Sequence, residues 1–274
     1  MNIELDGHTA YAYTGGKPLD PKLPGVAFVH GALHDHSVWI LQSRYLAHHG
    51  HAVLAVDLPA HGRSAGEPLG VEAAGRWLAG LIEASGLRRA ALVGHSMGSL
   101  IALEAAAQLG ARASALVMVG TGYPMKVSPK LLELCQRDAL AAIDLVNALS
   151  NSTHAAKPSH PGPGFSIHGS NRALARRTQR GYAAGNLFHA DFTACDAYAA
   201  LESTASKIKC PVTLILGARD QMTSPQAVAP IVAALKPRVV TLPVGHNLMA
   251  EAPDGVLNTI NDALNDALAQ EQAR

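Results

Sequence analysis

Residues 90–109 read AALVGHSMGSLIALEAAAQL, and they are the most informative part of this 274-residue chain. The first residues form a short apolar run, which is expected of a strand covered on both faces. Residues 97–109 have a helical pattern, so the chain must turn abruptly from strand to helix at Ser96. Gly94 and Gly98, two positions before and after Ser96, leave room for strained backbone geometry. Such a turn projects the Ser96 hydroxyl at the carboxyl edge of a sheet, beside the free N–H groups of a helix start.

Ser96 also has a simpler interpretation, because serines are favoured at positions that cap a helix. The motif of residues 94–98 on its own occurs by chance in many sequences. The apolar run before it and the helical pattern after it favour a strand–turn–helix element over a simple cap.

Similar apolar runs alternate with helical patterns along most of the chain. The expected strands lie at residues 26–29, 52–56, 90–93, 115–119, 212–216 and 239–242. The expected helices lie at residues 39–49, 71–85, 97–109, 225–235 and 253–270. This alternation predicts an α/β protein with a mostly parallel, doubly wound sheet. Residues 3–5 and 8–13 flank Asp6-Gly7, a pair that predicts an N-terminal antiparallel hairpin at one edge of that sheet.

The segment of residues 122–207 interrupts the alternation, because it contains no convincing core strand. Its helical patterns lie at residues 129–149, 172–184 and 191–204. They surround a polar loop rich in Pro and Gly at residues 154–164. We therefore predict a core domain formed by residues 1–121 and 208–274, and an inserted helical cap formed by residues 122–207.

Charge and cysteine content limit the partners and the location that we expect. Lys and Arg number 22 and Asp and Glu 21, so the net charge is +1 and offers no basic field for nucleic acid or anionic lipid. No apolar run reaches the roughly 18–20 residues of a membrane-spanning helix, and no basic segment followed by an apolar one marks a secretory signal at the start. Cys135, Cys195 and Cys210 are odd in number and far apart, which favours reduced thiols and a cytoplasmic protein.

A serine hydroxyl is a poor nucleophile at neutral pH and requires a positioned base. His246 follows the last expected strand, and histidine, with an ordinary pKa near 6.5, exchanges a proton around pH 7. Asp220 directly follows the strand at residues 212–216 and would orient His246 and stabilise its protonated form. Because the carboxyl ends of parallel strands meet at one edge, we predict a catalytic triad of Ser96, Asp220 and His246.

Each of these assignments competes with an ordinary structural role. His246 could be a surface histidine, although its place after the last strand argues against that role. Asp220 could instead cap the helix that begins near Pro225, or pair with Arg219. Asp57 also lies at a strand end, and we interpret it as a structural residue of the turn, with a smaller claim to be the triad acid.

The loop after the first buried strand reads His30-Gly31-Ala32-Leu33. An acyl-transfer intermediate carries an oxyanion, which two preorganised N–H donors stabilise. The N–H of Met97 is one expected donor and the N–H of Ala32 is the other. Leu33 replaces Ala32 in this role if the loop is wound differently, since backbone donors leave no signature in the side chains.

These motifs together resemble the α/β-hydrolase superfamily, in its branch with a helical cap. The resemblance spans about residues 25 to 250 apart from the cap, and its motifs are His30-Gly31, residues 57–64, residues 94–98, residues 217–220 and Gly245-His246. It implies the α/β-hydrolase fold. The acyl-transfer chemistry expected of Ser96 requires no cofactor.

The same resemblance assigns roles to individual residues. It implies that Ser96 is the nucleophile, and that Asp220 and His246 complete the triad. It also implies that Ala32 and Met97 form the oxyanion hole. The related epoxide hydrolases and haloalkane dehalogenases use an Asp nucleophile, so Ser96 argues against those two activities.

Other polar clusters support no further site. Residues 34–36 and 48–51 are rich in His but lack a matching ligand set that would close a metal site. No phosphate-loop Lys-Ser/Thr pair is present, so nucleotide binding is not expected. Cys135 lies on an apolar helical face, which favours core packing. Several apolar cap positions are candidates for either the cap core or a substrate pocket: Met125, Leu131, Phe165, Tyr182, Leu187 and Phe188.

The sequence thus predicts a serine hydrolase that cleaves carboxylic esters of small to medium size through an acyl-enzyme on Ser96. A carbon–carbon bond hydrolase, a lactonase or an amidase would use the same triad. An arginine-bearing pocket would favour acidic ring-cleavage products, and Arg172, Arg176, Arg177 and Arg180 are available for it, although solvation on a helix surface is their default role. A non-catalytic ligand receptor is the remaining alternative, because one fold can serve several functions.

Overall fold

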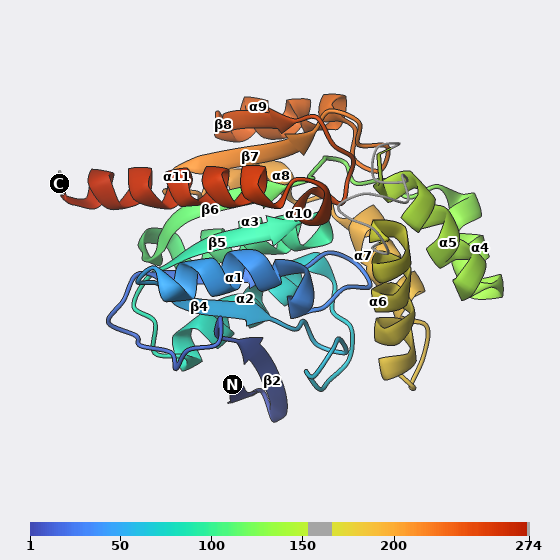
Figure 1. Cartoon of the computed structure of the whole chain (residues 1–274), viewed down its shortest axis with the longest axis horizontal. Helices are drawn as coiled ribbons and strands as arrows, with labels where there is room; N and C mark the ends of the chain where they lie inside the picture. Colours follow the sequence, from blue (N-terminus) through green and yellow to red (C-terminus); the bar gives the residue numbers. More distant parts are fainter. Residues whose placement is uncertain (153–165, 273–274) are drawn as a thin grey trace.

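A single mixed sheet organises the chain, and its strand order is β1-β2-β4-β3-β5-β6-β7-β8. The computed structural model describes residues 1–152 and 166–272 (Figure 1). The strands are β1 (Asn2–Leu5), β2 (His8–Tyr13), β3 (Gly25–Val29), β4 (Ala52–Val56), β5 (Ala90–His95), β6 (Ala113–Val119), β7 (Val212–Gly217) and β8 (Arg238–Leu242). The pairs β1–β2 and β2–β4 are antiparallel and all the others are parallel. The predicted mostly parallel sheet with an antiparallel hairpin at its start is therefore confirmed.

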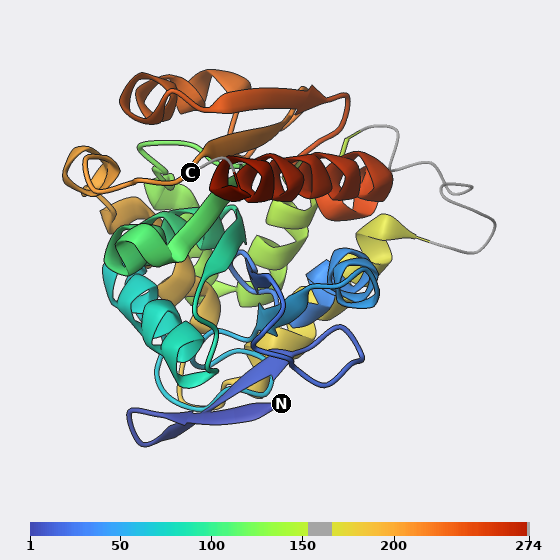
Figure 2. The same cartoon turned by 90° about the vertical axis from the view of Figure 1, so that its left-hand side faces the viewer.

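Helices cover both faces of the sheet, because successive side chains of each strand point to opposite faces. Along β3, Val26 and Phe28 join one apolar cluster while Ala27 and Val29 join the other. The first cluster is covered by α1 (Ile40–His48), α10 (Leu248–Glu251) and α11 (Pro253–Gln272). The second is covered by α2 (Val71–Ala84), α3 (Met97–Leu109), α8 (Leu201–Ala205) and α9 (Ala229–Leu235). Figure 2 shows α2 and α3 (cyan to green) on one side of the sheet and α1 (blue) on the other.

Three short 3₁₀ turns complete these layers: η1 (His36–Trp39), η2 (Gly110–Arg112) and η3 (Pro225–Val228). Two of these turns occupy residues that we predicted to be helical, so those predictions are corrected. The helix expected at residues 39–49 follows η1 and begins at Ile40. The helix expected at residues 225–235 is divided into η3 and α9, because Pro230 has no N–H for the helical hydrogen bond.

Four helices follow β6 and lie beyond the carboxyl ends of the strands (Figure 1). They are α4 (Pro129–Arg137), α5 (Ala139–Ser150), α6 (Ile167–Gly181) and α7 (Leu187–Ala197). Within residues 120–152 and 166–211 the structure contains no strand. The loop predicted at residues 154–164, and Phe165, lie outside the described residues. The division into a core (residues 1–121 and 208–274) and a cap (residues 122–207) remains our proposal.

The single helix predicted at residues 129–149 is wrong. Asp138 separates α4 from α5 with φ of −149°, and its side chain accepts a hydrogen bond from Ala141 N–H at 3.0 Å. This is an N-cap, which satisfies a free N–H at a helix start. The helix predicted at residues 191–204 is also divided, since α7 begins earlier at Leu187 and α8 begins at Leu201. Among the described helices, none combines the length and apolarity needed to cross a membrane.

Candidate active site

Ser96 lies between the end of β5 and the start of α3, in a strained conformation with φ of +53° and ψ of −123°. A positive φ is costly for a residue with a side chain and persists only where the surroundings enforce it. Here the Ser96 N–H donates to Val119 O of the neighbouring strand β6 at 2.9 Å. The strained turn predicted from the motif is therefore present.

The flanking glycines are required by close backbone approach. A Cβ at Gly94 would lie 2.1 Å from Gly98 O, and a Cβ at Gly98 would lie 2.3 Å from His30 O. A side chain at either position would separate the start of α3 from β5 or from the end of β3. Gly31 is similarly restricted, since its Cβ would lie 3.2 Å from Ser96 Cβ. The turn and the loop after β3 are thus packed against each other through glycines.

Asp220 and His246 follow β7 and β8, and their side chains meet at the same edge of the sheet. His246 Nδ1 lies 2.7 Å from Asp220 Oδ2, and both side chains are buried. Asp220 Oδ1 accepts hydrogen bonds from the N–H groups of Met222 and Thr223, both at 2.8 Å. The Thr223 hydroxyl donates to Asp220 Oδ2 at 2.9 Å. These contacts orient the Asp220 carboxylate toward His246.

The pKa of Asp220 is lowered from its ordinary value of 3.8. Burial alone would raise this pKa, but the charge of His246 and the hydrogen bonds from His246 and Thr223 outweigh burial. Asp220 is therefore ionised at neutral pH. An ionised carboxylate only accepts hydrogen bonds, so His246 Nδ1 is the donor of the contact with Asp220.

Ser96 and His246 line the same cavity, which has a volume of about 90 Å³. Within residues 1–152 and 166–272, no hydrogen bond is recorded for the Ser96 hydroxyl or for His246 Nε2. Hydrogen bonds between a nucleophile and its base are often long before substrate binds. The structure thus joins Asp220 to His246 by a hydrogen bond, and brings Ser96 to the same cavity without a hydrogen bond to His246 among the described residues.

The two expected oxyanion donors are available in this structure. Met97 is the first residue of α3, so its N–H has no partner within the helix. Ala32 lines the cavity, and no hydrogen bond is recorded for its N–H within the described part of the chain. Leu33, the fallback donor, is excluded because its N–H donates to Asp191 Oδ2 at 2.9 Å and its φ is +54°.

His30 holds the loop after β3 in place. Its Nδ1 donates to Gly31 O at 2.8 Å, and its Nε2 accepts from Leu58 N–H at 3.1 Å. The ring is therefore neutral, since one nitrogen donates and the other accepts. Burial lowers the pKa of His30 to about 4, which agrees with this assignment.

The loop that carries His246 is held in place by hydrogen bonds with residues that the sequence did not reveal. The Glu251 carboxylate accepts hydrogen bonds from Gly245 N–H at 3.2 Å and from Ser152 N–H at 3.1 Å. Asn247 N–H donates to Ser150 O at 2.9 Å, which connects the loop to α5. The contacts with Ser150 and Ser152 join positions about 100 residues apart, so no local pattern could have revealed them.

Two of the candidate pocket residues line the cavity, Met125 and Phe188. The apolar cluster among α4–α7 contains Leu131, Tyr182 and Leu187 instead. Cys135 is fully buried in the same cluster, in agreement with a packing role.

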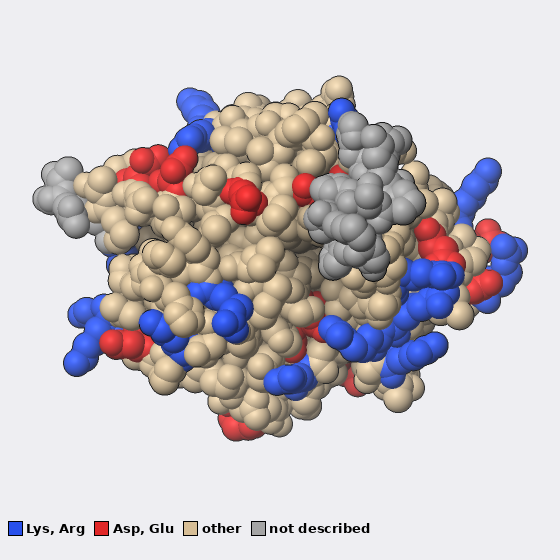
Figure 3. Space-filling model, viewed as in Figure 1, with Lys and Arg blue, Asp and Glu red and all other residues tan. Residues whose placement is uncertain are grey.

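The four arginines of α6 do not line the cavity. Arg172 and Arg176 pair with Asp144, and Arg177 pairs with Asp35 at 2.6 Å. Figure 3 shows blue side chains gathered on the surface over α6. An arginine-bearing pocket for acidic ring-cleavage products is therefore not supported by these residues.

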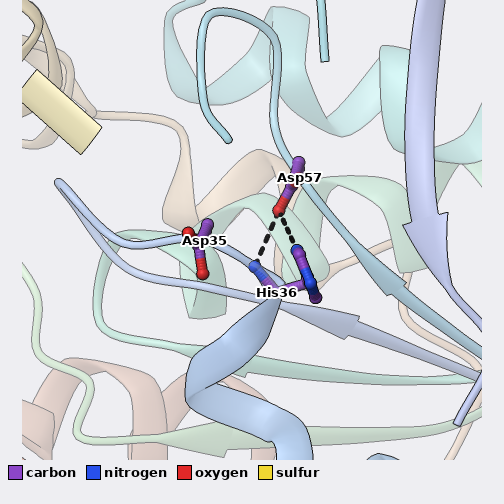
Figure 4. A group of neighbouring side chains, drawn as sticks. All are labelled: Asp35, His36 and Asp57. Atoms are coloured by element: carbon purple, nitrogen blue, oxygen red, sulfur yellow. Dashed lines mark hydrogen bonds and ion pairs between the residues drawn. The ribbon is translucent and has the colours of Figure 1, made fainter. Parts of the chain in front are cut away.

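Asp35, His36 and Asp57 form a group whose potential ligand atoms lie within 4.8 Å of one another (Figure 4). Asp57 Oδ1 accepts hydrogen bonds from the backbone N–H and from Nδ1 of His36, both at 2.7 Å. Asp35 accepts from Ser37 N–H at 2.9 Å and from Arg177. These contacts connect neighbouring loops, which supports the structural role expected for Asp57 and does not favour a metal site.

The fold and this strand–turn–helix site define a hydrolase of the α/β type. The chain matches the family model described as "Alpha/beta hydrolase family" over residues 26–259, and it belongs to that family. The expected superfamily is thereby confirmed, and the protein is a hydrolase. A comparison with curated protein sequences gives no match.

Several solved structures share the fold at low sequence identity. The enol-lactonase from Burkholderia xenovorans LB400 has a TM-score of 0.82 at 21% identity, covering 97% of this chain and 100% of that one. A thermophilic esterase from Thermogutta terrifontis has a TM-score of 0.78 at 21% identity, with coverage of 97% and 98%. A putative aryl esterase from Burkholderia cenocepacia has a TM-score of 0.77 at 20% identity, with coverage of 98% and 99%. These similarities establish the fold.

Proposed function

We propose that this hydrolase cleaves carboxylic esters of small to medium size through an acyl-enzyme on Ser96. The observation that carries the proposal is the His246–Asp220 contact of 2.7 Å, made by a ring that lines the same cavity as Ser96. Because Asp220 occupies Nδ1, the other ring nitrogen is the one left to exchange a proton with Ser96. The family, whose members include esterases and lactonases among the solved structures, agrees with this chemistry.

The proposed reaction has two halves. In the first, His246 Nε2 takes the proton of the Ser96 hydroxyl as the oxygen attacks the ester carbonyl carbon. The N–H groups of Ala32 and Met97 stabilise the resulting oxyanion, and protonated His246 returns the proton to the leaving alcohol. In the second, His246 takes a proton from water, which attacks the acyl group on Ser96. The carboxylic acid leaves and Ser96 regains its proton.

A cyclic ester is the second candidate substrate, since ring opening of a lactone is the same acyl transfer on Ser96. The similarity to an enol-lactonase with a TM-score of 0.82 favours it over amide or carbon–carbon bond cleavage. The cavity volume of about 90 Å³ favours short acyl chains in either case. A series of p-nitrophenyl esters of increasing chain length, measured beside a small lactone, separates the two candidates.

Labelling with a fluorophosphonate probe tests the mechanism without assuming a substrate. We expect the wild type to be labelled, and Ser96→Ala and His246→Ala to lose labelling. Ser206→Ala, which removes an exposed serine outside the cavity, is the matched control and keeps full labelling. Labelling that persists in Ser96→Ala would contradict the proposal. A folded wild type that is never labelled would favour a non-catalytic receptor.

A further inference from the structure

The cavity wall next to the proposed oxyanion loop contains a histidine, His34, that the reaction does not use. His34 Nε2 lies 3.0 Å from Asn171 Oδ1 of α6. Asn171 Nδ2 in turn donates to Asn147 Oδ1 of α5 at 3.0 Å. Asn147 Nδ2 donates to the backbone carbonyl of His168 at 2.9 Å. The chain of contacts therefore runs from a backbone carbonyl to the ring of His34.

The donor and the acceptor of every hydrogen bond in this series follow from the backbone carbonyl of His168 at its end. A backbone carbonyl only accepts, so Asn147 directs its NH₂ group to His168 and its oxygen to Asn171. That oxygen also only accepts, so Asn171 directs its NH₂ group to Asn147 and its own oxygen to His34. His34 must then donate from Nε2. Burial lowers the pKa of His34 to about 4, so the ring is neutral and Nδ1 carries no hydrogen.

His34 Nδ1 is thus a hydrogen-bond acceptor, and it is buried without a partner among the described residues. Buried polar atoms in native proteins almost always have a hydrogen-bond partner. Because the His34 ring lines the cavity, a group that enters the cavity can supply the missing donor.

His95 adds a second acceptor of the same kind beside Ser96. Its Nε2 donates to His246 O at 2.9 Å, and burial lowers the pKa of His95 well below 6.5, so the ring is neutral and Nδ1 carries no hydrogen. This Nδ1 has no partner within the described residues. The rings of His34 and His95 are stacked with centroids 6.1 Å apart. His34 also lies only two residues beyond Ala32 in the loop. His34 is therefore close to the place where the scissile carbonyl would bind.

We propose that His34 is a specificity-determining residue that accepts a hydrogen bond from a hydroxyl or N–H group of the substrate. Asn171 and Asn147 are positioning residues, because they hold His34 with Nε2 protonated and Nδ1 free. The preferred substrates are then esters or lactones with a hydroxyl or N–H donor near the scissile carbonyl. This inference rests on the proposed function and narrows its substrate class.

Matched substrates test the inference directly. We would measure kcat/KM for p-nitrophenyl 2-hydroxybutyrate and 3-hydroxybutyrate, each beside its methoxy counterpart, which keeps the oxygen but cannot donate. The wild type should prefer at least one hydroxy ester over its methoxy partner by about tenfold or more, the usual range for a buried hydrogen bond. Equal values for both pairs, with ester turnover intact, overturn the role of His34 and leave the proposed function standing.

Three variants test whether the preference for hydroxy esters depends on His34. His34→Phe removes the acceptor and should bring the hydroxy/methoxy ratio to about one. Asn171→Asp places a carboxylate against Nε2, favours the doubly protonated ring and should also abolish the preference. His189→Phe replaces a histidine that does not line the cavity, and it should keep the wild-type ratio. A preference that survives in both His34→Phe and Asn171→Asp contradicts the proposal.

A measurement independent of turnover uses ¹⁵N NMR of the histidine rings in the Ser96→Ala variant. The His34 signals are assigned by their loss in His34→Phe. We expect a protonated Nε2 and an unprotonated Nδ1 at pH 7, and a shift of the Nδ1 signal when 3-hydroxybutyramide is added. The opposite tautomer, or an Nδ1 signal unchanged at saturating ligand, overturns the inference even if no ester is turned over. Failure of fluorophosphonate labelling, in contrast, bears on the proposed function alone.

Discussion

Two buried histidine–aspartate pairs lie in different regions of this molecule and differ in what the second ring nitrogen contacts. At the end of β7 and β8, His246 Nδ1 lies 2.7 Å from Asp220. Between the loop after β4 and helix α7, His61 Nε2 lies 3.0 Å from Asp191. Within the described residues, His246 Nε2 has no recorded partner and its ring lines the cavity. His61 Nδ1, by contrast, lies 2.9 Å from Pro59 O.

This difference distinguishes the proposed catalytic base, His246, from a histidine with a structural role, His61. Both nitrogens of His61 face acceptors, a carbonyl and a carboxylate, so both carry hydrogens and the ring is charged. Burial alone would lower the pKa of His61, but the charge and hydrogen bond of Asp191 outweigh burial and raise it. A ring already protonated at both nitrogens cannot accept a proton. The same two residue types thus form the proposed base and acid in one region, and attach α7 to the loop at Leu33 in the other.

The largest expected effect comes from Asp220→Asn. An amide at this position no longer requires His246 to carry its hydrogen on Nδ1, so the ring loses the tautomer that accepts the Ser96 proton. We expect kcat for ester hydrolysis to fall by about 10⁴-fold, as is typical when the acid of such a triad becomes its amide. Steady-state kinetics with a p-nitrophenyl ester measure this change.

Asp57→Asn is the matched control, because Asp57 is a buried aspartate at another strand end that also contacts a histidine, His36. This variant should retain kcat within about tenfold of the wild type, since a structural hydrogen bond acts mainly on stability. A large loss of kcat in Asp57→Asn, together with an active Asp220→Asn, would mean that Asp57 and not Asp220 is the acid of the triad.

Asp191→Asn should act mainly on stability. Asp191 Oδ2 accepts from Leu33 N–H at 2.9 Å and faces His61 Nε2, so its removal leaves a buried ring without its counter-charge. We expect the free energy of unfolding at pH 6 to fall by about 3 kcal/mol, the lower end of the effect of breaking a buried ion pair. Urea unfolding measures it, and Asp196→Asn, on the same helix and less buried, should lose much less. A kcat loss comparable to that of Asp220→Asn would refute the contrast between the pairs.

The His61–Asp191 pair should also give stability a distinct pH dependence. The folded-state pKa of His61 lies above its ordinary value of 6.5, so the stabilisation is complete below pH 6.5 and is lost as pH rises through the folded pKa. The free energy of unfolding that is lost is about 1.4 kcal/mol for each unit by which the folded-state pKa exceeds the ordinary one.

Unfolding free energies of the wild type and His61→Gln, measured from pH 6 to pH 9, test this expectation. The difference between the two proteins should shrink as pH rises. His48→Gln, which replaces an exposed histidine, is the control for loss of an imidazole. A difference that grows with pH would mean that the folded protein does not hold a charged His61.

The part of the site that is formed by residues at the ends of the strands could be predicted, because parallel strands end at a common edge. Ser96, Asp220 and His246 each follow a strand, so their positions at strand ends were enough to predict that they lie at the same edge. The structure joins Asp220 to His246 and brings Ser96 to the same cavity, while their catalytic roles remain predictions. The strand–helix turn was also readable locally, since Gly94 and Gly98 mark the close backbone approach around it.

The part of the site that is formed with helices α6 and α7 was less predictable, because its contacts join distant parts of the chain. Leu33 N–H bonds to Asp191, 158 positions away, and His34 bonds to Asn171, 137 positions away. No spacing within the sequence reveals either contact. The break at Asp138 was different, since an aspartate before an apolar helical run is a local capping signal that periodicity alone overlooked. The cytoplasmic location expected from the cysteine count also remains a prediction.

The smallest expected effect concerns the support of Asp220 by Thr223. The Thr223 hydroxyl donates to Asp220 Oδ2 at 2.9 Å and lies 3.2 Å from His246 Nδ1. Thr223→Val removes this bond but keeps the backbone N–H bond to Asp220, so the pKa of Asp220 should rise and kcat should fall by about three- to tenfold. Ser224→Ala, whose hydroxyl has no recorded contact within the described residues, is the control for the loop. A loss in Thr223→Val as large as that of Asp220→Asn would mean that the hydroxyl, rather than the carboxylate, orients His246.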